Sequence, residues 1–218
     1  MKKILCLLLV SVLLFSLCGC FGSDKDVRGE VTSATQSQEV TEFSFGKTAS
    51  NTYKNDFLGL SCTLPEEWSF ATDEEILELN SITKDALDEE LTEVLENADL
   101  IYDMNASTAE GSNVNVNLQK LSLAQVATLD IKKELESQID MIKSSYESMG
   151  FTKTEAVYEK VKVDGKEVDA LKITANIQDY SFYGVSFSFR KGNYLATATV
   201  GAMGTDKTAE YLGYFKFN

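Results

Sequence analysis

Apolar and polar residues alternate with a period of two in several parts of the chain, which predicts β-strands with one buried face. The run over Phe57–Leu64 places four side chains on one face: Leu58, Leu60, Cys62 and Leu64. Pro65 ends this strand because proline cannot continue a β ladder. A second run, Asn113–Gln119, alternates without a break, and we expect its valine and leucine face to be core and its amide face to point outward. Shorter strands are predicted over Glu42–Phe45 and Leu100–Tyr102.

Helical periodicity occurs in three segments between these strands. Thr72 and Glu75 have the spacing of a capping box, which predicts a helix with an inner face made of Ile76, Leu77 and Leu79. A second helix is predicted from about Thr83 or Asp85, with an apolar stripe at Leu87, Leu91, Val94 and Leu95. The longest predicted helix runs from about Leu129 to Met149, and Gly150 supplies its left-handed C-cap. Its stripe recurs at steps of three and four: Ile131, Leu135, Ile139, Ile142, Tyr146 and Met149.

The C-terminal third of the chain is rich in strands. Asp164-Gly165 lies between two alternating segments, and this dipeptide is typical of a two-residue hairpin turn. Lys191-Gly192-Asn193 separates a second pair of strands, Ser181–Arg190 and Tyr194–Val200, and a short helix over about Lys207–Phe215 closes the chain. These elements predict an α+β fold with a largely antiparallel sheet flanked by helices.

The N-terminus has the features of a bacterial export signal. Lys2 and Lys3 precede an apolar segment, Ile4–Leu17, that is too short for a comfortable transmembrane helix. The segment ends in Leu17-Cys18-Gly19-Cys20, which resembles the lipobox Leu-x-Gly-Cys of bacterial lipoproteins. The resemblance implies that Cys20 carries a diacylglyceryl thioether and becomes the first residue of an extracytoplasmic protein that is anchored to the cell membrane. The alternative is an uncleaved signal anchor.

The polar, Ser/Thr/Gln-rich sequence after Cys20 predicts a flexible tether. The chain therefore divides into a lipoprotein signal peptide (residues 1–19), a tether (20–41) and a folded domain (42–218). A tether of this length has a reach of ~25 Å, which lifts the domain from the bilayer without fixing its orientation.

Composition excludes several classes of function. The chain has no histidine, which removes Ser-His-Asp and Cys-His catalysis and histidine-ligated zinc. Its formal charge of −14 and its two arginines, Arg28 and Arg190, exclude nucleic-acid binding, and the net charge predicts repulsion from anionic lipid head groups. Cys62 is the only cysteine expected in the mature domain, and its place on an apolar strand face predicts a buried, unreactive thiol. No cofactor or metal motif is present in the sequence.

Acidic residues are concentrated between Asp73 and Asp103, where twelve carboxylates accompany one basic residue, Lys84. Carboxylates distributed around a helix do not converge as a calcium site requires. This segment is interpreted either as a solvated face that maintains solubility or as a surface for a cationic protein partner. The amide side chains of Asn113–Gln119 are a further candidate, for sugar binding, but that strand offers no aromatic platform.

Three stretches of the chain have a further pattern: Asn51-x-Tyr53-x-Asn55, then Phe57-x-Gly59-Leu60 through Leu64-Pro65-Glu66-x-Trp68, and Asp103-Met104-x-Ala106 ahead of Asn113-Val114-Asn115-Val116. These stretches resemble secreted bacterial lipoproteins with a PsbP-like domain. The resemblance implies an α/β/α sandwich and a non-catalytic binding or accessory module. It supplies no functional residue. A carboxylate-dependent cell-envelope hydrolase and a small-ligand carrier remain the alternatives.

Overall fold

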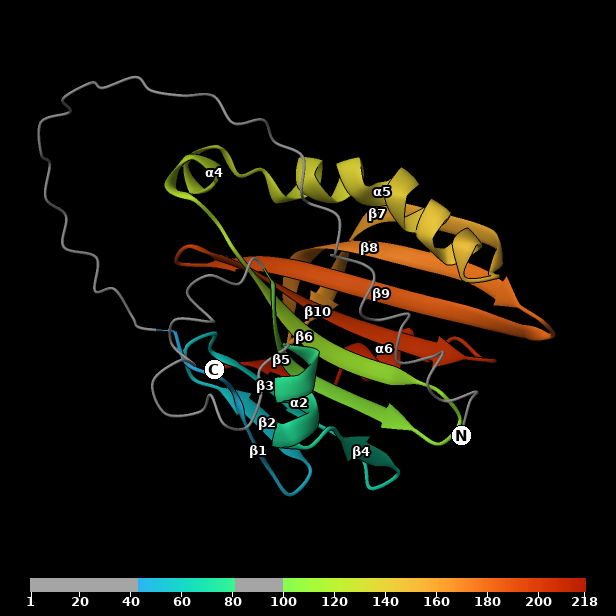
Figure 1. The fold of residues 1–218 in the computed structure, drawn as a ribbon, viewed down its shortest axis with the longest axis horizontal. Coiled ribbons are helices and arrows are strands. Elements are labelled where there is room, and N and C mark those ends of the chain that lie inside the picture. The colour runs from blue at the N-terminus through green and yellow to red at the C-terminus, as the bar shows by residue number, and fades with distance from the viewer. Residues whose placement is uncertain (1–42, 81–99) are drawn as a thin grey trace, which may run out of the picture.

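The computed structural model describes residues 43–80 and 100–218, whose strands form two antiparallel sheets (Figure 1). The smaller sheet has the order β1-β2-β3-β11, and its strands are β1 (Lys47–Ala49), β2 (Thr52–Asn55), β3 (Leu60–Thr63) and β11 (Phe215–Phe217). The larger sheet has the order β4-β5-β6-β10-β9-β8-β7. Its strands are β4 (Trp68–Phe70), β5 (Leu100–Thr108), β6 (Asn113–Lys120), β7 (Thr152–Val163), β8 (Lys166–Ile177), β9 (Tyr180–Lys191) and β10 (Tyr194–Met203).

The main core lies between the two sheets. Leu60, Cys62 and Phe215 of the smaller sheet are fully buried against side chains of the larger sheet such as Val116 and Phe187. The predicted α+β fold with a largely antiparallel sheet is confirmed. Its helices are α2 (Asp73–Leu79), α4 (Leu123–Thr128), α5 (Ile131–Ser148) and α6 (Thr208–Leu212). Among the described residues, no helix is both long and apolar enough to cross a bilayer.

Helix α5 covers the opposite face of the larger sheet, over β7 and β8 (Figure 1). The apolar stripe predicted from the α5 sequence is the face of the helix that packs on the larger sheet. Leu135, Ile142 and Tyr146 are buried in a second core cluster with Leu171 and Ile173 of β8. Gly150 has a φ of +90°, as expected of the residue that follows a helix in the left-handed conformation.

Both predicted hairpins are present. Val163 of β7 pairs with Lys166 of β8, and the two residues between them, Asp164 and Gly165, have φ values of 50° and 75°. These angles are those of a type I′ turn, whose twist matches the twist of the strands that it joins. In the second hairpin Lys191 pairs with Tyr194 of β10, so the loop is the dipeptide Gly192-Asn193.

The expectation that the amide face of β6 points outward is wrong. Asn115 and Asn117 are 3% and 2% exposed. They lie opposite Thr199 and Thr197 of β10, whose hydroxyls bond to Ser186 and Ser188 of β9. Because β6 is an inner strand of the larger sheet, its polar side chains belong to a buried band of Asn, Thr and Ser rather than to a solvated edge.

Several predicted boundaries also differ from the structure. Phe43–Gly46 is not a strand, since the first strand begins at Lys47, but Phe43 packs its ring on Phe57 and Tyr194. The strand predicted at Leu100–Tyr102 continues to Thr108, and the last helix ends at Leu212. Phe215 instead starts β11, which pairs with β3. The signal peptide, the tether and the helix predicted from Thr83 or Asp85 lie outside the described residues.

Candidate functional site

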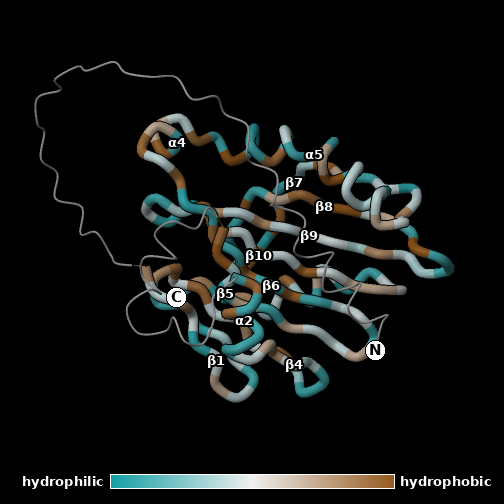
Figure 2. Tube along the Cα trace, viewed as in Figure 1, coloured by the Kyte–Doolittle hydropathy of each residue, from teal (hydrophilic) through white to brown (hydrophobic). Residues whose placement is uncertain are grey.

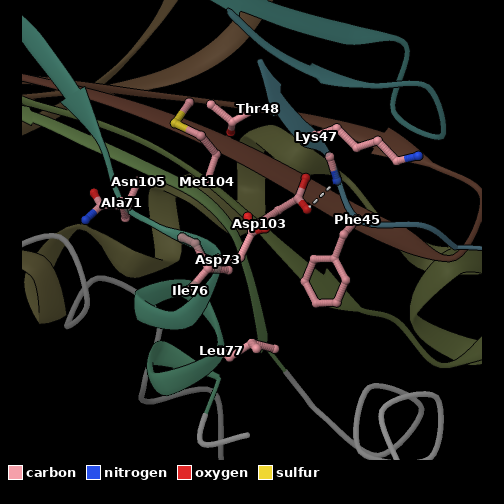
Figure 3. A pocket seen from close by; sticks show the side chains of 11 residues that line it. Phe45, Lys47, Thr48, Ala71, Asp73, Ile76, Leu77, Asp103, Met104 and Asn105 are labelled. Atoms are coloured by element: carbon pink, nitrogen blue, oxygen red, sulfur yellow. Dashed lines mark hydrogen bonds between the residues drawn. The ribbon is translucent and has the colours of Figure 1, made fainter. Parts of the chain in front are cut away.

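An open pocket of about 480 Å³ lies between the segment that precedes β1, helix α2 and strand β5. Figure 3 shows the side chains that line it, with Asp103 among them and Phe45 and Leu77 on two sides. Its walls are mainly apolar, and Lys47, Thr48 and Asp73 supply polar groups. The complete lining is Phe45, Gly46, Lys47, Thr48, Ala71, Asp73, Ile76, Leu77, Asp103, Met104 and Asn105.

Helix α2 forms one wall of this pocket and is fixed at both ends. The Thr72 side chain accepts the Glu75 N–H, and the Glu75 side chain accepts the Thr72 N–H, so the predicted capping box is present. At the other end, Asn80 donates its amide to the carbonyl of Tyr102 (2.8 Å) and accepts the Tyr102 N–H (2.8 Å). These bonds join the helix to β5, while its inner side chains, Ile76 among them, stay half-buried beside the pocket.

Asp103 enters the site through a β-bulge. Tyr102 pairs with Asn117 and Met104 pairs with Val116, so Asp103 is an extra residue without a partner across the ladder. A bulge redirects a side chain that regular alternation would place elsewhere. Here it turns the carboxylate towards the smaller sheet, where it meets the Gly46 N–H at 2.8 Å (Figure 3).

Two side chains of β2 complete the environment of the Asp103 carboxylate. Asn55 donates its amide to Oδ2 at 2.7 Å, and the Tyr53 hydroxyl donates to the same oxygen. Asp103 is 5% exposed, and burial raises the pKa of its carboxyl, while the bonds from Tyr53, Gly46 and Asn55 oppose that rise. Burial, and then the adjacent carboxylate, raises the pKa of Tyr53 well above its ordinary value. Asp103 therefore joins β5 to β2 and to the segment before β1.

The acidic segment Asp73–Asp103 is described only at its two ends. Asp73, Glu74, Glu75 and Glu78 are exposed on α2, and residues 81–99 lie outside the described part of the chain. Asp103 is buried, so it does not belong to an acidic surface and that part of the expectation is wrong. The described portion of such a surface is α2, which borders the pocket.

The remaining candidates from the sequence are Cys62, a metal site and Cys20. Cys62 is fully buried, as expected, and burial raises the pKa of its thiol to about 12. Within residues 43–80 and 100–218, no group of three or more Cys, Asp or Glu side chains has the arrangement of a metal site. Cys20, the expected lipid attachment site, lies outside the described residues.

Sequence reasoning did not find the pocket. Its walls come from segments near residues 46, 75 and 104, and no local pattern brings these three segments together. One signal was present. The stretches that carried the PsbP-like resemblance include Tyr53, Asn55 and Asp103, which meet in the structure as one hydrogen-bonded group.

No protein-family model matches this chain, and no curated protein matches it. Among solved structures it is similar to a protein of Bacteroides thetaiotaomicron, with 10% identity, a TM-score of 0.39 and coverage of 77% of this chain. That alignment spans only 48% of the Bacteroides protein. It is also similar to LpqN of Mycobacterium tuberculosis, a protein involved in cell envelope biogenesis, with 6% identity, a TM-score of 0.33 and coverage of 70% and 75% of the two chains. At these TM-scores neither likeness supports an argument about function.

Proposed function

We propose that this chain is a bacterial extracytoplasmic lipoprotein, anchored to the cell membrane through acylated Cys20, and that it acts as a non-catalytic binding module. The N-terminal sequence supports the anchor, because charge, apolar length and the order Leu17-Cys18-Gly19-Cys20 agree with one another. The observation that carries the binding role is the open pocket between β1, α2 and β5. No other cavity is needed for the proposal.

The pocket favours an occupant that is apolar and lies next to positive charge. Phe45, Ile76, Leu77 and Met104 offer apolar contact area, which is the main source of affinity in such sites. Helix α2 presents exposed carboxylates at Asp73, which borders the pocket, and at Glu74 and Glu78. A cationic protein partner that inserts an apolar side chain into the pocket satisfies both features, and the charges would accelerate its association.

The carboxylates of the pocket support binding rather than hydrolysis. A glycoside hydrolase needs two carboxyl groups about 5–10 Å apart that are free to act on a substrate. Asp103 accepts three hydrogen bonds from the protein itself, so its oxygens are engaged in holding β5 to β2. Asp73 lies at the exposed start of α2. We therefore keep the carboxylate-dependent hydrolase as the weaker alternative.

Photo-crosslinking on living cells tests the binding role. A benzophenone amino acid replaces Leu77 in the pocket, and a matched chain carries it at Val157, an exposed apolar position on β7. We expect discrete protein adducts from position 77 that are absent from position 157 and that weaken at least about fivefold after Asp73→Lys and Glu78→Lys. Identical adducts from both positions, or none from position 77, would contradict a partner at the pocket.

The anchor is tested separately by Cys20→Ser. The unchanged protein should fractionate with membranes, and its N-terminal peptide should carry the mass of a diacylglyceryl group on Cys20. The Cys20→Ser protein should lose that mass and the membrane association. Normal processing and firm membrane attachment of the variant would mean that the N-terminal segment is an uncleaved anchor.

A small-ligand carrier is the second candidate, because about 480 Å³ lies within the range of small-molecule sites, about 300–1,000 Å³. The two candidates differ in what copurifies with the protein. Native mass spectrometry of a carrier would show a bound small mass, and Leu77→Trp, which fills the pocket, would remove it. A partner-binding module would show no such mass in either chain.

A further inference from the structure

Helix α4 (Leu123–Thr128) is an apolar protrusion that the binding role does not explain. None of its six residues is charged and none is buried. Leu123 is 87% exposed, more than Val157 or Tyr180, the other exposed large hydrophobic residues of the described chain. The hydropathy colouring in Figure 2 shows the hydrophobic character of α4 at one end of the molecule. Helices of soluble proteins are normally held by one buried face, and α4 has none, so Leu123 is available for a contact outside the domain.

The described chain begins at the same end of the molecule. The Leu121 N–H, two residues before α4, donates to the carbonyl of Asn193 (2.7 Å) in the β9–β10 turn. Tyr194, the next residue, packs its ring against Phe43, with ring centroids 5.4 Å apart. Phe43 is the first described residue, so the described chain begins beside the β9–β10 turn and close to α4.

Basic residues are concentrated at this end of the larger sheet. Arg190 and Lys191 lead into the β9–β10 turn, and Lys120 at the end of β6 pairs with Tyr194. The adjacent β7–β8 turn is flanked by exposed Lys162 and Lys166. Asp164 and Glu167 lie among these lysines, but basic residues are still in excess at this end, whereas the loops at the opposite end carry Glu110, Asp179 and Asp206 together with Lys207. The net charge of −14 therefore hides a polarity along the sheet.

We propose that α4 and the basic β9–β10 turn form a membrane-contacting surface, on which Leu123 enters the head-group region of an anionic phospholipid bilayer. An exposed apolar side chain next to lysine and arginine is the pattern of interfacial membrane contact, since the apolar group enters the boundary region and the basic groups attract anionic lipid. Charge complementarity selects an anionic bilayer as occupant, and the described chain begins beside this surface, so a lipid on Cys20 would bring the surface within reach of the membrane while the tether itself leaves the orientation free. The inference rests on the proposed anchor for that step only. Contact at Leu123 would orient the domain, and α2, which lines the pocket, lies apart from α4 (Figure 1).

Tryptophan quenching by brominated lipids tests this orientation. Leu123→Trp and the control Tyr180→Trp place a tryptophan at exposed apolar positions at opposite ends of the larger sheet, and buried Trp68 is common to both chains. Each acylated protein is reconstituted into brominated phosphatidylcholine vesicles with and without phosphatidylglycerol. We expect the emission added at position 123 to fall by at least roughly half in the anionic vesicles and that added at position 180 to be unchanged. Arg190→Gln with Lys191→Gln should restore most of the lost emission.

Equal quenching at positions 123 and 180, or no quenching at position 123, would overturn the proposal. A third outcome would also overturn the membrane-contact proposal. If lipid does not quench the Leu123→Trp emission but crosslinking of a protein partner shifts it, α4 belongs to a protein interface. The same measurement on chains that carry Cys20→Ser, at an excess of anionic vesicles, separates the two proposals. If the Leu123→Trp emission is quenched in the Cys20→Ser chain, the surface contacts the bilayer without the anchor. The membrane-contacting surface is then supported even if the N-terminal peptide of the unchanged protein carries no acyl group.

Discussion

Asp103 illustrates how a single additional residue in a strand determines a local structure. Asp103 is the extra residue of the β5 bulge, and its carboxylate reaches both β2 and the backbone of Gly46. Three donors converge on it. A buried carboxylate that is satisfied in this way is costly to replace, because each donor would otherwise remain unpaired.

We predict that Asp103→Asn destabilises the fold by about 1–3 kcal/mol, since the asparagine NH₂ would face groups that are themselves donors. The effect should depend on pH. Burial raises the pKa of Asp103, so its contribution to the free energy of unfolding is full below the ordinary aspartate pKa of ~3.9 and is lost as pH rises through the raised value. Urea unfolding of both chains at a series of pH values should therefore show the advantage of the wild type shrinking as pH increases.

Asp179→Asn is the control for this series, because Asp179 is exposed in the β8–β9 turn and should change little. An advantage of the wild type that widens with pH would contradict the prediction. It would mean that the bonds from Tyr53, Gly46 and Asn55 outweigh burial and that the folded state favours the ionised carboxylate.

Cys62 gives a second prediction at the residue scale. The thiol is fully buried, and burial raises its pKa to about 12, so almost no thiolate exists at neutral pH. Iodoacetamide should modify Cys62 only at the rate at which the fold opens, and mass spectrometry follows the added mass. Ser137→Cys, at an exposed position on α5, provides a thiol that reacts at once. Labelling of Cys62 as fast as the control would contradict its burial.

At the scale of elements, the sequence was sufficient wherever local chemistry decides the structure. The stripe of α5, the capping box of α2 and the Asp164-Gly165 turn are local patterns, and all three are present as predicted. The hydrophobic pattern gave wrong or missing predictions where residues far apart in the sequence determine the structure. Alternation along β6 separates two faces but does not reveal that both are covered, so the burial of Asn115 was missed. The pocket requires three distant segments and a bulge that arises only from strand pairing.

The β7–β8 turn also connects the two sheets. The Asp164 carboxylate accepts the Phe217 N–H (3.1 Å) and pairs with Lys216 (3.2 Å), both on β11. Gly165 has a φ of +75° with open space around it, so substitution there tests backbone strain alone. We predict that Gly165→Ala lowers the free energy of unfolding by about 1–2 kcal/mol, because L-residues pay that amount in the left-handed region.

Chemical denaturation of Gly165→Ala and Gly165→Asn measures this strain. Asparagine tolerates the left-handed conformation, so Gly165→Asn should cost clearly less than Gly165→Ala. Equal costs would indicate that a side chain of any kind disturbs the contact between this turn and β11 rather than the backbone conformation.

At the scale of the whole molecule, charge opposes folding more than it supports it. The chain carries 34 acidic and 20 basic residues. In the described part of the chain, ion pairs such as Lys54–Asp56 and Lys132–Glu136 join largely exposed side chains. Exposed pairs contribute little to stability, whereas folding brings the excess carboxylates closer together, and added salt screens the repulsion between them.

We therefore predict that the melting temperature rises as potassium chloride is increased from low to physiological ionic strength, where the Debye length falls to ~8 Å. Calorimetry of the mature protein measures the change, and the charge-reduced chain Glu74→Gln with Glu78→Gln is the control, because it removes two exposed acids from α2. That chain should begin with a higher melting temperature and respond less to salt. A melting temperature that falls with added salt would mean that attraction between the basic end of the larger sheet and the acidic turns outweighs the net repulsion. In that case the polarity that we use to orient the domain towards the membrane would act within the molecule instead.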